Sequence, residues 1–152
     1  MSTQRAILTS ATAELVLEVI EGALVISHWG MPLGKISGDA RLAMSPSVTN
    51  SGFDTVQNPG VMREGSRGFL GRSALSGHRN GKAWSSHFSV TSFNASTHSV
   101  EVEMHDASAA LTLGFSFAMD SHGVLSIQAK IKNIGSDQYT LNEFIYWLPL
   151  PQ

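Results

Sequence analysis

The sequence has 152 residues, of which 42% are hydrophobic, and both values are typical of a single globular domain that buries a core. Its 10 Lys and Arg against 12 Asp and Glu give a formal net charge of -2, which disfavours a nucleic-acid-binding protein because phosphates would not be attracted. No cysteine is present, which excludes disulfides and thiolate metal sites, and no apolar stretch matches a signal peptide or a membrane span. We therefore expect a cytoplasmic protein without a membrane contact.

The first elements predicted along the chain are two β-strands within residues 6–30. In ELVLEVI (14–20) and GALVISHWG (22–30), apolar side chains recur at every second position, which is the period of a strand. Glu21-Gly22 separates the two runs, as the turn of a β-hairpin does.

The middle section, residues 31–83, shows no such periodicity and holds most of the chain's 14 glycines. A stretch of this length without clear elements predicts long loops, and binding residues are often carried on loops. Any functional site is therefore expected in this section.

The last section returns to a strand pattern. HSVEVEM (98–104), LTLGFSFAM (111–119) and LSIQAKIK (125–132) each alternate apolar side chains with others, and DSHG (120–123) predicts a turn between the last two. A final run, YTLNEFIYWLPLP, ends in prolines that cannot donate to a sheet. Because no segment shows a sustained helical period, the predicted fold class is all-β, an antiparallel β-sandwich with long loops in residues 31–83.

Motifs for the common catalytic and cofactor chemistries are incomplete in this chain. SGHRNGKA (76–83) departs from a phosphate-binding loop in its glycine spacing and has Ala83 where a hydroxyl is required. The six histidines lack the spacing of a zinc protease, the serines lack a nucleophile elbow, and the acids are scattered rather than paired as in glycosidases. We therefore predict no catalytic residue, no metal ion and no cofactor.

Arginine and aromatic side chains of the loop section fit sugar binding better. An indole stacks on the face of a sugar ring, and a guanidinium forms paired hydrogen bonds with hydroxyls. The candidates in the loop section are Arg67, Arg72, His78 and Arg79, joined by Trp84 directly after it and by Trp29 at the end of the second predicted strand. Because Trp84 is predicted to begin a strand, a position in the core or in a subunit interface is its alternative role.

Three segments resemble the N-terminal domain of glycoside hydrolase family 36 α-galactosidases. They are GALVISHWGMPLG, GFLGRSALSGHRNGKAW with the SSHFSV that follows it, and GVLSIQAKIKNIGSDQYTLNEFIYWLPLP. The similarity runs from about Leu15 to Pro151, with the segments in the family's order. It implies that residues 1–152 form one galactose-mutarotase-like supersandwich domain. It also implies a (β/α)8 barrel with the catalytic aspartates, C-terminal to this domain and absent from this chain.

The resemblance also implies how such a domain works. Family members are often oligomers in which a loop of this domain reaches a neighbouring subunit's active site, and Arg72 matches an arginine that helps to bind the galactoside there. Arg67, His78, Arg79 and Trp84 are its neighbours, and a plain subunit contact is the alternative role for Arg72. The expected function is a non-catalytic domain that holds subunits together and shapes the active site of an α-galactosidase. Its partners would be its own barrel, neighbouring subunits and the galactoside.

Two other functions stay open, a free-standing carbohydrate-binding module and a small mutarotase-like enzyme. A mutarotase needs a general acid and a general base that face one groove. We expect His105 and Glu103 to point to opposite faces of their strand, which would not support this alternative.

Overall fold

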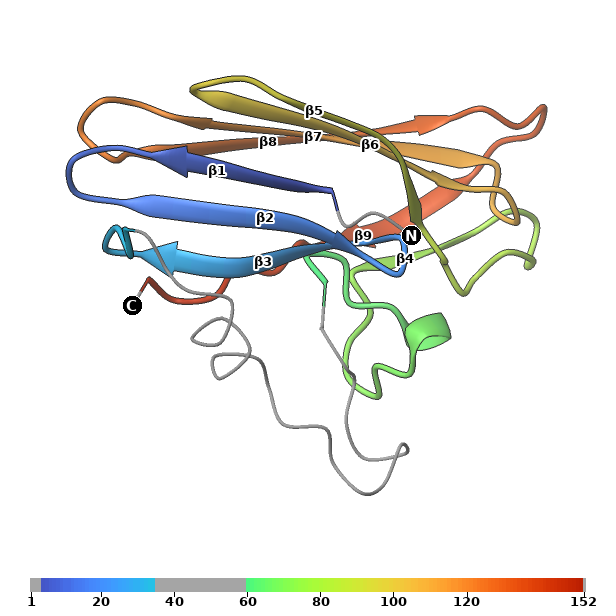
Figure 1. The fold of residues 1–152 in the computed structure, drawn as a ribbon. Helices are drawn as coiled ribbons and strands as arrows, with labels where there is room; N and C mark the ends of the chain where they lie inside the picture. The colour runs from blue at the N-terminus through green and yellow to red at the C-terminus, as the bar shows by residue number, and fades with distance from the viewer. Residues whose placement is uncertain (1–3, 35–59, 152) are drawn as a thin grey trace.

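The computed structural model describes residues 4–34 and 60–151, and in this part of the chain nearly all regular structure is β (Figure 1). One short 3-10 helix, η1, spans Gly65–Arg67. The strands are β1 Arg5–Thr9, β2 Glu14–Ile20, β3 Ala23–Gly30, β4 Leu75–His78, β5 Ser89–Ala95, β6 Ser99–Asp106, β7 Leu111–Met119, β8 Leu125–Asn133 and β9 Thr140–Phe144. In these described residues there is no helix with the length and apolar character of a membrane span.

The strands form three antiparallel sheets, in the orders β1-β2-β3, β5-β6-β7-β8 and β4-β9. Figure 1 shows the first two sheets as stacked layers, with the four-stranded sheet above and β4 and β9 at one end of the sandwich. The predicted antiparallel β-sandwich is therefore confirmed. Two facing sheets bury one face of each strand, which is how a chain without helices makes a core.

The core lies between the two layers, and the strand period of two places its side chains there. Along β6 and β7 every second residue is buried, so Val102 and Phe117 face inward while Glu101 and Glu103 face outward. From the opposite layer come Leu8, Leu15, Leu17 and Leu24, and Phe88 joins them from the segment before β5. The rings of Phe115 and Phe117 stack with their centroids 5.8 Å apart.

The predicted hairpin of residues 14–30 is present as β2 and β3. Both turn residues, Glu21 and Gly22, have positive φ, at 50° and 77°, and this conformation suits the twist of a two-residue hairpin. A bulge between Val16 and Leu17 shifts the register by one residue. It leaves Ser27 free to donate from its hydroxyl to the Glu18 carboxylate.

Two strands were not predicted from the sequence. β1 was not recognised as a separate strand, because the turn at Ser10 to Ala13 has no glycine or proline and is closed by the Ser10 side chain, which accepts the Thr12 and Ala13 N–H groups. β4 lies inside the section expected to be loops, and its four residues are too few for a period to show. The same section was expected to form long loops, and its residues 35–59 lie outside the described part of the chain.

Candidate functional site

The predicted site residues other than Trp29 lie on one continuous stretch that runs from η1 through β4 to the segment before β5. This stretch and the residues just before it are held to the C-terminal segment by backbone hydrogen bonds. Ile145 N donates to Ala74 O at 2.7 Å, and Trp147 N donates to Val61 O at 3.0 Å. Figure 1 shows the stretch in green beside the end of the sandwich where β9 lies. The loop section is therefore anchored to the sheets at two points rather than by its ends alone.

Arg67 is bound on all sides by the protein itself. Its Nε donates to Glu64 Oε2 at 3.1 Å, its Nη1 to Glu21 O at 3.2 Å and its Nη2 to Phe88 O at 2.6 Å. Glu64 is buried, and its second oxygen accepts the Phe88 N–H at 2.9 Å. Because each guanidinium nitrogen already has an acceptor, the visible role of Arg67 is to join η1 to the β2–β3 turn and to the start of β5.

Arg79 and His78 also make internal contacts, around a tight turn at Asn80-Gly81. Both turn residues have positive φ, as the Asn-Gly pair of a hairpin turn does. Gly81 N–H donates to His78 Nδ1 at 3.2 Å. Arg79 donates to Ala109 O at 2.8 Å, to Asn133 Oδ1 at 2.7 Å and to the carbonyl of Asp137. This arginine therefore fastens the turn to the loops at one end of the four-stranded sheet.

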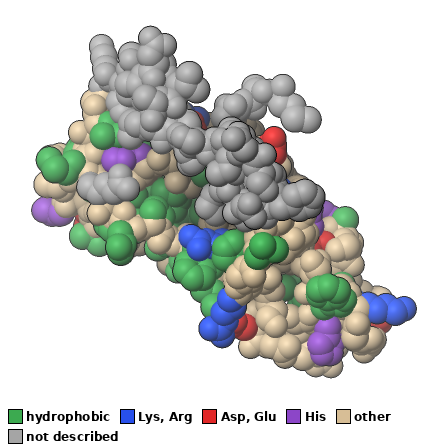
Figure 2. All heavy atoms as spheres, turned by 90° about the horizontal axis from the view of Figure 1, so that it is seen from below, with side chains coloured by type: hydrophobic (Ala, Val, Ile, Leu, Met, Phe, Trp, Pro, Cys, Tyr) green, Lys and Arg blue, Asp and Glu red, His purple; other side chains and the backbone are tan. Residues whose placement is uncertain are grey.

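Arg72 and Trp84, by contrast, are open to solvent. The Arg72 side chain is 69% exposed, and its Nε and Nη2 form a paired ionic contact with the carboxylate of Glu143 on β9. Within the described residues its Nη1 has no partner. Trp84 is 73% exposed and Leu70 is 88% exposed, so neither packs in the core. Figure 2 shows, on the face seen from below, green hydrophobic atoms beside separate blue and red groups rather than a broad field of one charge.

Arg63 is a residue that the sequence reasoning missed. Its guanidinium lies over two aromatic rings, with its central carbon 5.3 Å from the centroid of Phe69 and 4.2 Å from that of Trp147. Its Nε is buried and has no hydrogen-bond partner in the described part of the chain. The sequence gives little sign of this stack, because Trp147 is far from Arg63 along the chain and belongs to the last apolar run.

Asp106, at the end of β6, is a buried carboxylate with four donors around it. His87 N–H reaches its Oδ2 at 2.8 Å, while the Ser108 N–H, the Ser108 hydroxyl and the Ala109 N–H reach its Oδ1 at 2.7 to 3.0 Å. Burial raises the pKa of Asp106, but these hydrogen bonds to the charged form outweigh it, so the pKa lies below the usual 3.8. Both carboxylate oxygens of Asp106 thus accept hydrogen bonds from the protein itself, and these bonds hold the β6–β7 turn in place.

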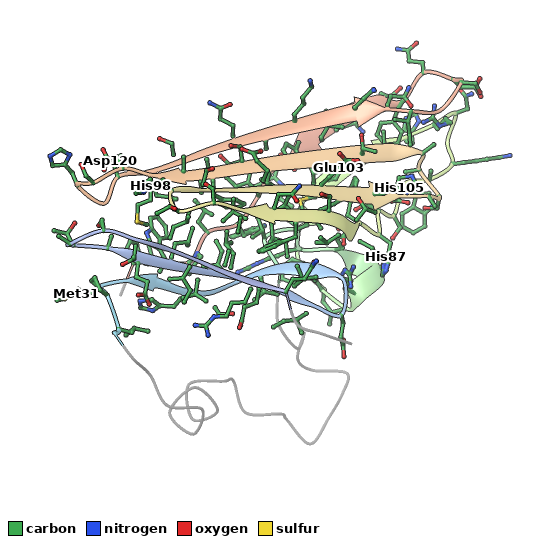
Figure 3. All side chains as sticks on the ribbon, turned by 45° about the horizontal axis from the view of Figure 1, so that its top comes forward. Met31, His87, His98, Glu103, His105 and Asp120 are labelled. Carbon is green, nitrogen blue, oxygen red and sulfur yellow. The ribbon has the colours of Figure 1, made fainter. Side chains whose placement is uncertain are left out.

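The other acids and histidines of the described residues are spread over the sandwich. Figure 3 shows His98 and Asp120 at one end of the sandwich and His87, Glu103 and His105 toward the other. In residues 4–34 and 60–151 no three His, Asp or Glu side chains are placed to hold a metal ion. The expectation that Glu103 and His105 face opposite ways was wrong, because residues two apart on a regular strand share a face. Both lie on the outer face of β6, where Glu103 is exposed to solvent.

Comparison with known proteins gives the following similarities. Residues 22–152 match the family described as Glycosyl hydrolase family 36 N-terminal domain. Over 145 residues the chain is 24% identical to an alpha-galactosidase of Escherichia coli, and the match covers 95% of this chain and 20% of that protein.

Among solved structures, the fold is similar to that of a variant of the GH36 alpha-galactosidase AgaA from Geobacillus stearothermophilus in complex with 1-deoxygalactonojirimycin. The TM-score is 0.70 at 14% identity, and the match covers 94% of this chain and 24% of that one. This chain thus spans about a fifth to a quarter of the length of these two relatives.

Proposed function

The chain belongs to the glycoside hydrolase family 36 N-terminal domains, and on this premise we propose that it is the non-catalytic N-terminal part of an α-galactosidase. In this proposal a downstream catalytic barrel hydrolyses terminal α-linked galactose, while the β-sandwich assists assembly and shapes the active site of a neighbouring subunit. The division of labour is consistent with the described part of the chain, where the buried carboxylates of Glu64 and Asp106 accept structural hydrogen bonds and the labelled histidines lie at different ends of the sandwich.

The exposed Arg72 carries the proposal of a role at the active site. Every guanidinium nitrogen of Arg67 and both Nη atoms of Arg79 donate within the protein, whereas Arg72 projects from the loop before β4 with Nη1 unpartnered among the described residues. Its ionic contact with Glu143 holds the guanidinium in one orientation, which lowers the entropy lost on binding a hydroxyl group. Arg72 is also the position that resembles the family's substrate-binding arginine.

Replacing Arg72 by alanine in the longer protein tests this role. We expect KM for p-nitrophenyl α-D-galactoside to rise about tenfold, because a hydrogen bond from a charged donor is worth roughly 1.5 kcal/mol or more. The unfolding temperature should hardly change, because a solvent-exposed ion pair contributes at most about 1 kcal/mol. Steady-state kinetics and thermal unfolding of the same preparation give both values.

Lys132→Ala, on the outer face of β8, is the matched control and should leave KM unchanged. An Arg72→Ala protein with the KM of the unmodified enzyme would contradict a role in substrate binding and leave only a subunit contact.

One observation favours a second function: the exposed indole of Trp84 suits sugar stacking. Saturable binding of methyl α-galactoside by the 152-residue chain alone would favour the free-standing carbohydrate-binding module.

A further inference from the structure

The guanidinium of Arg63 is the least satisfied polar group in the described part of the structure. Its Nε is the one buried side-chain nitrogen or oxygen there without a hydrogen-bond partner. Neither of its Nη atoms has a hydrogen bond or ion pair within the described residues. Buried polar groups in native proteins are nearly always paired, so the Nε is an exception, while the two Nη atoms are not among the buried atoms and stay accessible to a further partner.

The neighbouring carboxylates are not available to fill this role. Both oxygens of Glu64, the next residue along the chain, are bound, one by Arg67 and the other by the Phe88 N–H. Glu143 on β9 is held through both oxygens by Arg72. Among the described residues, the carboxylates of Glu64 and Glu143 are therefore already paired with Arg67 and Arg72.

The two aromatic rings determine which kind of partner fits. The central carbon of the guanidinium lies over both rings, 5.3 Å from the centroid of Phe69 and 4.2 Å from that of Trp147, so both rings attract the cation. Its Nη N–H groups have no acceptor among the described residues and can donate to a further partner. A carboxylate matches the edge of a guanidinium with two parallel hydrogen bonds, and the apolar rings strengthen the attraction by excluding water.

We propose that the edge of Arg63 binds an Asp or Glu side chain of the catalytic domain that follows this domain in the same polypeptide. This inference rests on the proposed function in one respect, that such a domain follows. Trp147, which covers Arg63, lies on the C-terminal segment that would lead into it, so downstream residues begin near this site. Leu70, next to Phe69 in the chain, and Leu150, three residues after Trp147, are 88% and 86% exposed, and exposed apolar side chains together with aromatic and arginine residues are typical of a protein interface.

Zero-length coupling tests the contact in the longer protein. Arg63→Lys places a primary amine at this position, and a carbodiimide joins an amine to a carboxylate that touches it. Peptide mapping by mass spectrometry should show position 63 coupled to an Asp or Glu beyond residue 152 in a product of single-subunit mass. Lys132, exposed on β8, is the internal control and should not couple to the downstream domain.

A second variant avoids reliance on the geometry of lysine. Arg63→Met removes the donors but keeps a flexible side chain that packs against aromatic rings. In the 152-residue chain it should leave the unfolding midpoint unchanged or raise it, because no hydrogen bond is lost. In the longer protein it should lower the midpoint by about 2 to 4 °C, because the carboxylate loses its partner.

The proposal is overturned by coupling only to residues 1–152, by coupling between subunits, by no coupling, or by equal shifts of the midpoint in both proteins. A reading frame without a downstream domain would also overturn it. The proposed function is judged separately by galactoside turnover of the unmodified longer protein. An inactive protein in which position 63 still couples downstream would contradict the proposed activity and retain the contact.

Discussion

Phe117→Ala is expected to lower the free energy of unfolding of the 152-residue chain by about 4 kcal/mol. Removal of a large buried aromatic side chain costs roughly 3 to 5 kcal/mol, because transfer energy is lost and a cavity remains. Phe117 has no exposed surface and stacks on Phe115 in the middle of β7, so the sheets can do little to close the gap. Since domains of this size have total stabilities of about 5 to 15 kcal/mol, the variant should be largely destabilised.

Urea denaturation followed by tryptophan fluorescence measures this difference. Val124→Ala is the control, because it also shortens an apolar side chain but at a position after the β7–β8 turn that is 60% exposed. It should change the free energy of unfolding by less than about 0.5 kcal/mol. Equal effects of the two substitutions would show that β7 does not form the centre of the core.

Asp106→Asn is expected to lower the free energy of unfolding by about 3 kcal/mol at pH 7, and by progressively less as the pH becomes more acidic. The amide keeps one acceptor oxygen, but its NH2 group would face an N–H donor, so at least one buried donor loses its partner. The pKa of Asp106 is lowered in the folded state, so its carboxylate stabilises the fold above the unfolded pKa of about 3.9. That contribution is lost as the pH falls through the lower folded pKa.

Denaturation curves at pH 7 and pH 3 test this dependence. The difference between the unmodified chain and the Asn variant should shrink on acidification, because the unmodified chain loses the contribution that the variant lacks. Asp120→Asn is the control, since Asp120 also accepts backbone N–H groups in a turn and its pKa is also lowered, but it is exposed to solvent. Asp120→Asn should therefore lower the free energy of unfolding by less than Asp106→Asn does. A difference for Asp106→Asn that stays constant between the two pH values would contradict a role for the charged form.

Much of the fold could be predicted because apolar and polar residues alternate clearly along a strand wherever one face of that strand is buried. HSVEVEM and LTLGFSFAM lie in β6 and β7, whose inward residues are those that the period of two selects. β4 could not be found in this way, because it is stabilised by pairing with β9, more than sixty residues later in the chain. Such pairing depends on tertiary contacts rather than on a local pattern.

The candidate site was less predictable, because the residue type of an arginine does not reveal its acceptors. Arg67 and Arg79 were predicted with Arg72 as binding residues, yet they donate to carbonyl oxygens of Glu21, Phe88 and Ala109, and no sequence pattern identifies these acceptors. Every residue carries a backbone carbonyl, so only the fold determines which ones lie within reach. Arg63 was missed for the same reason, since Trp147 reaches it only in the folded chain.

The most direct test of the account is release of p-nitrophenol from p-nitrophenyl α-D-galactoside, measured in parallel for the 152-residue chain and for the longer protein. We expect sustained turnover by the longer protein and none by the 152-residue chain, because the proposed function places the catalytic aspartates in a downstream barrel. Turnover by the 152-residue chain, or an inactive longer protein, would contradict the account.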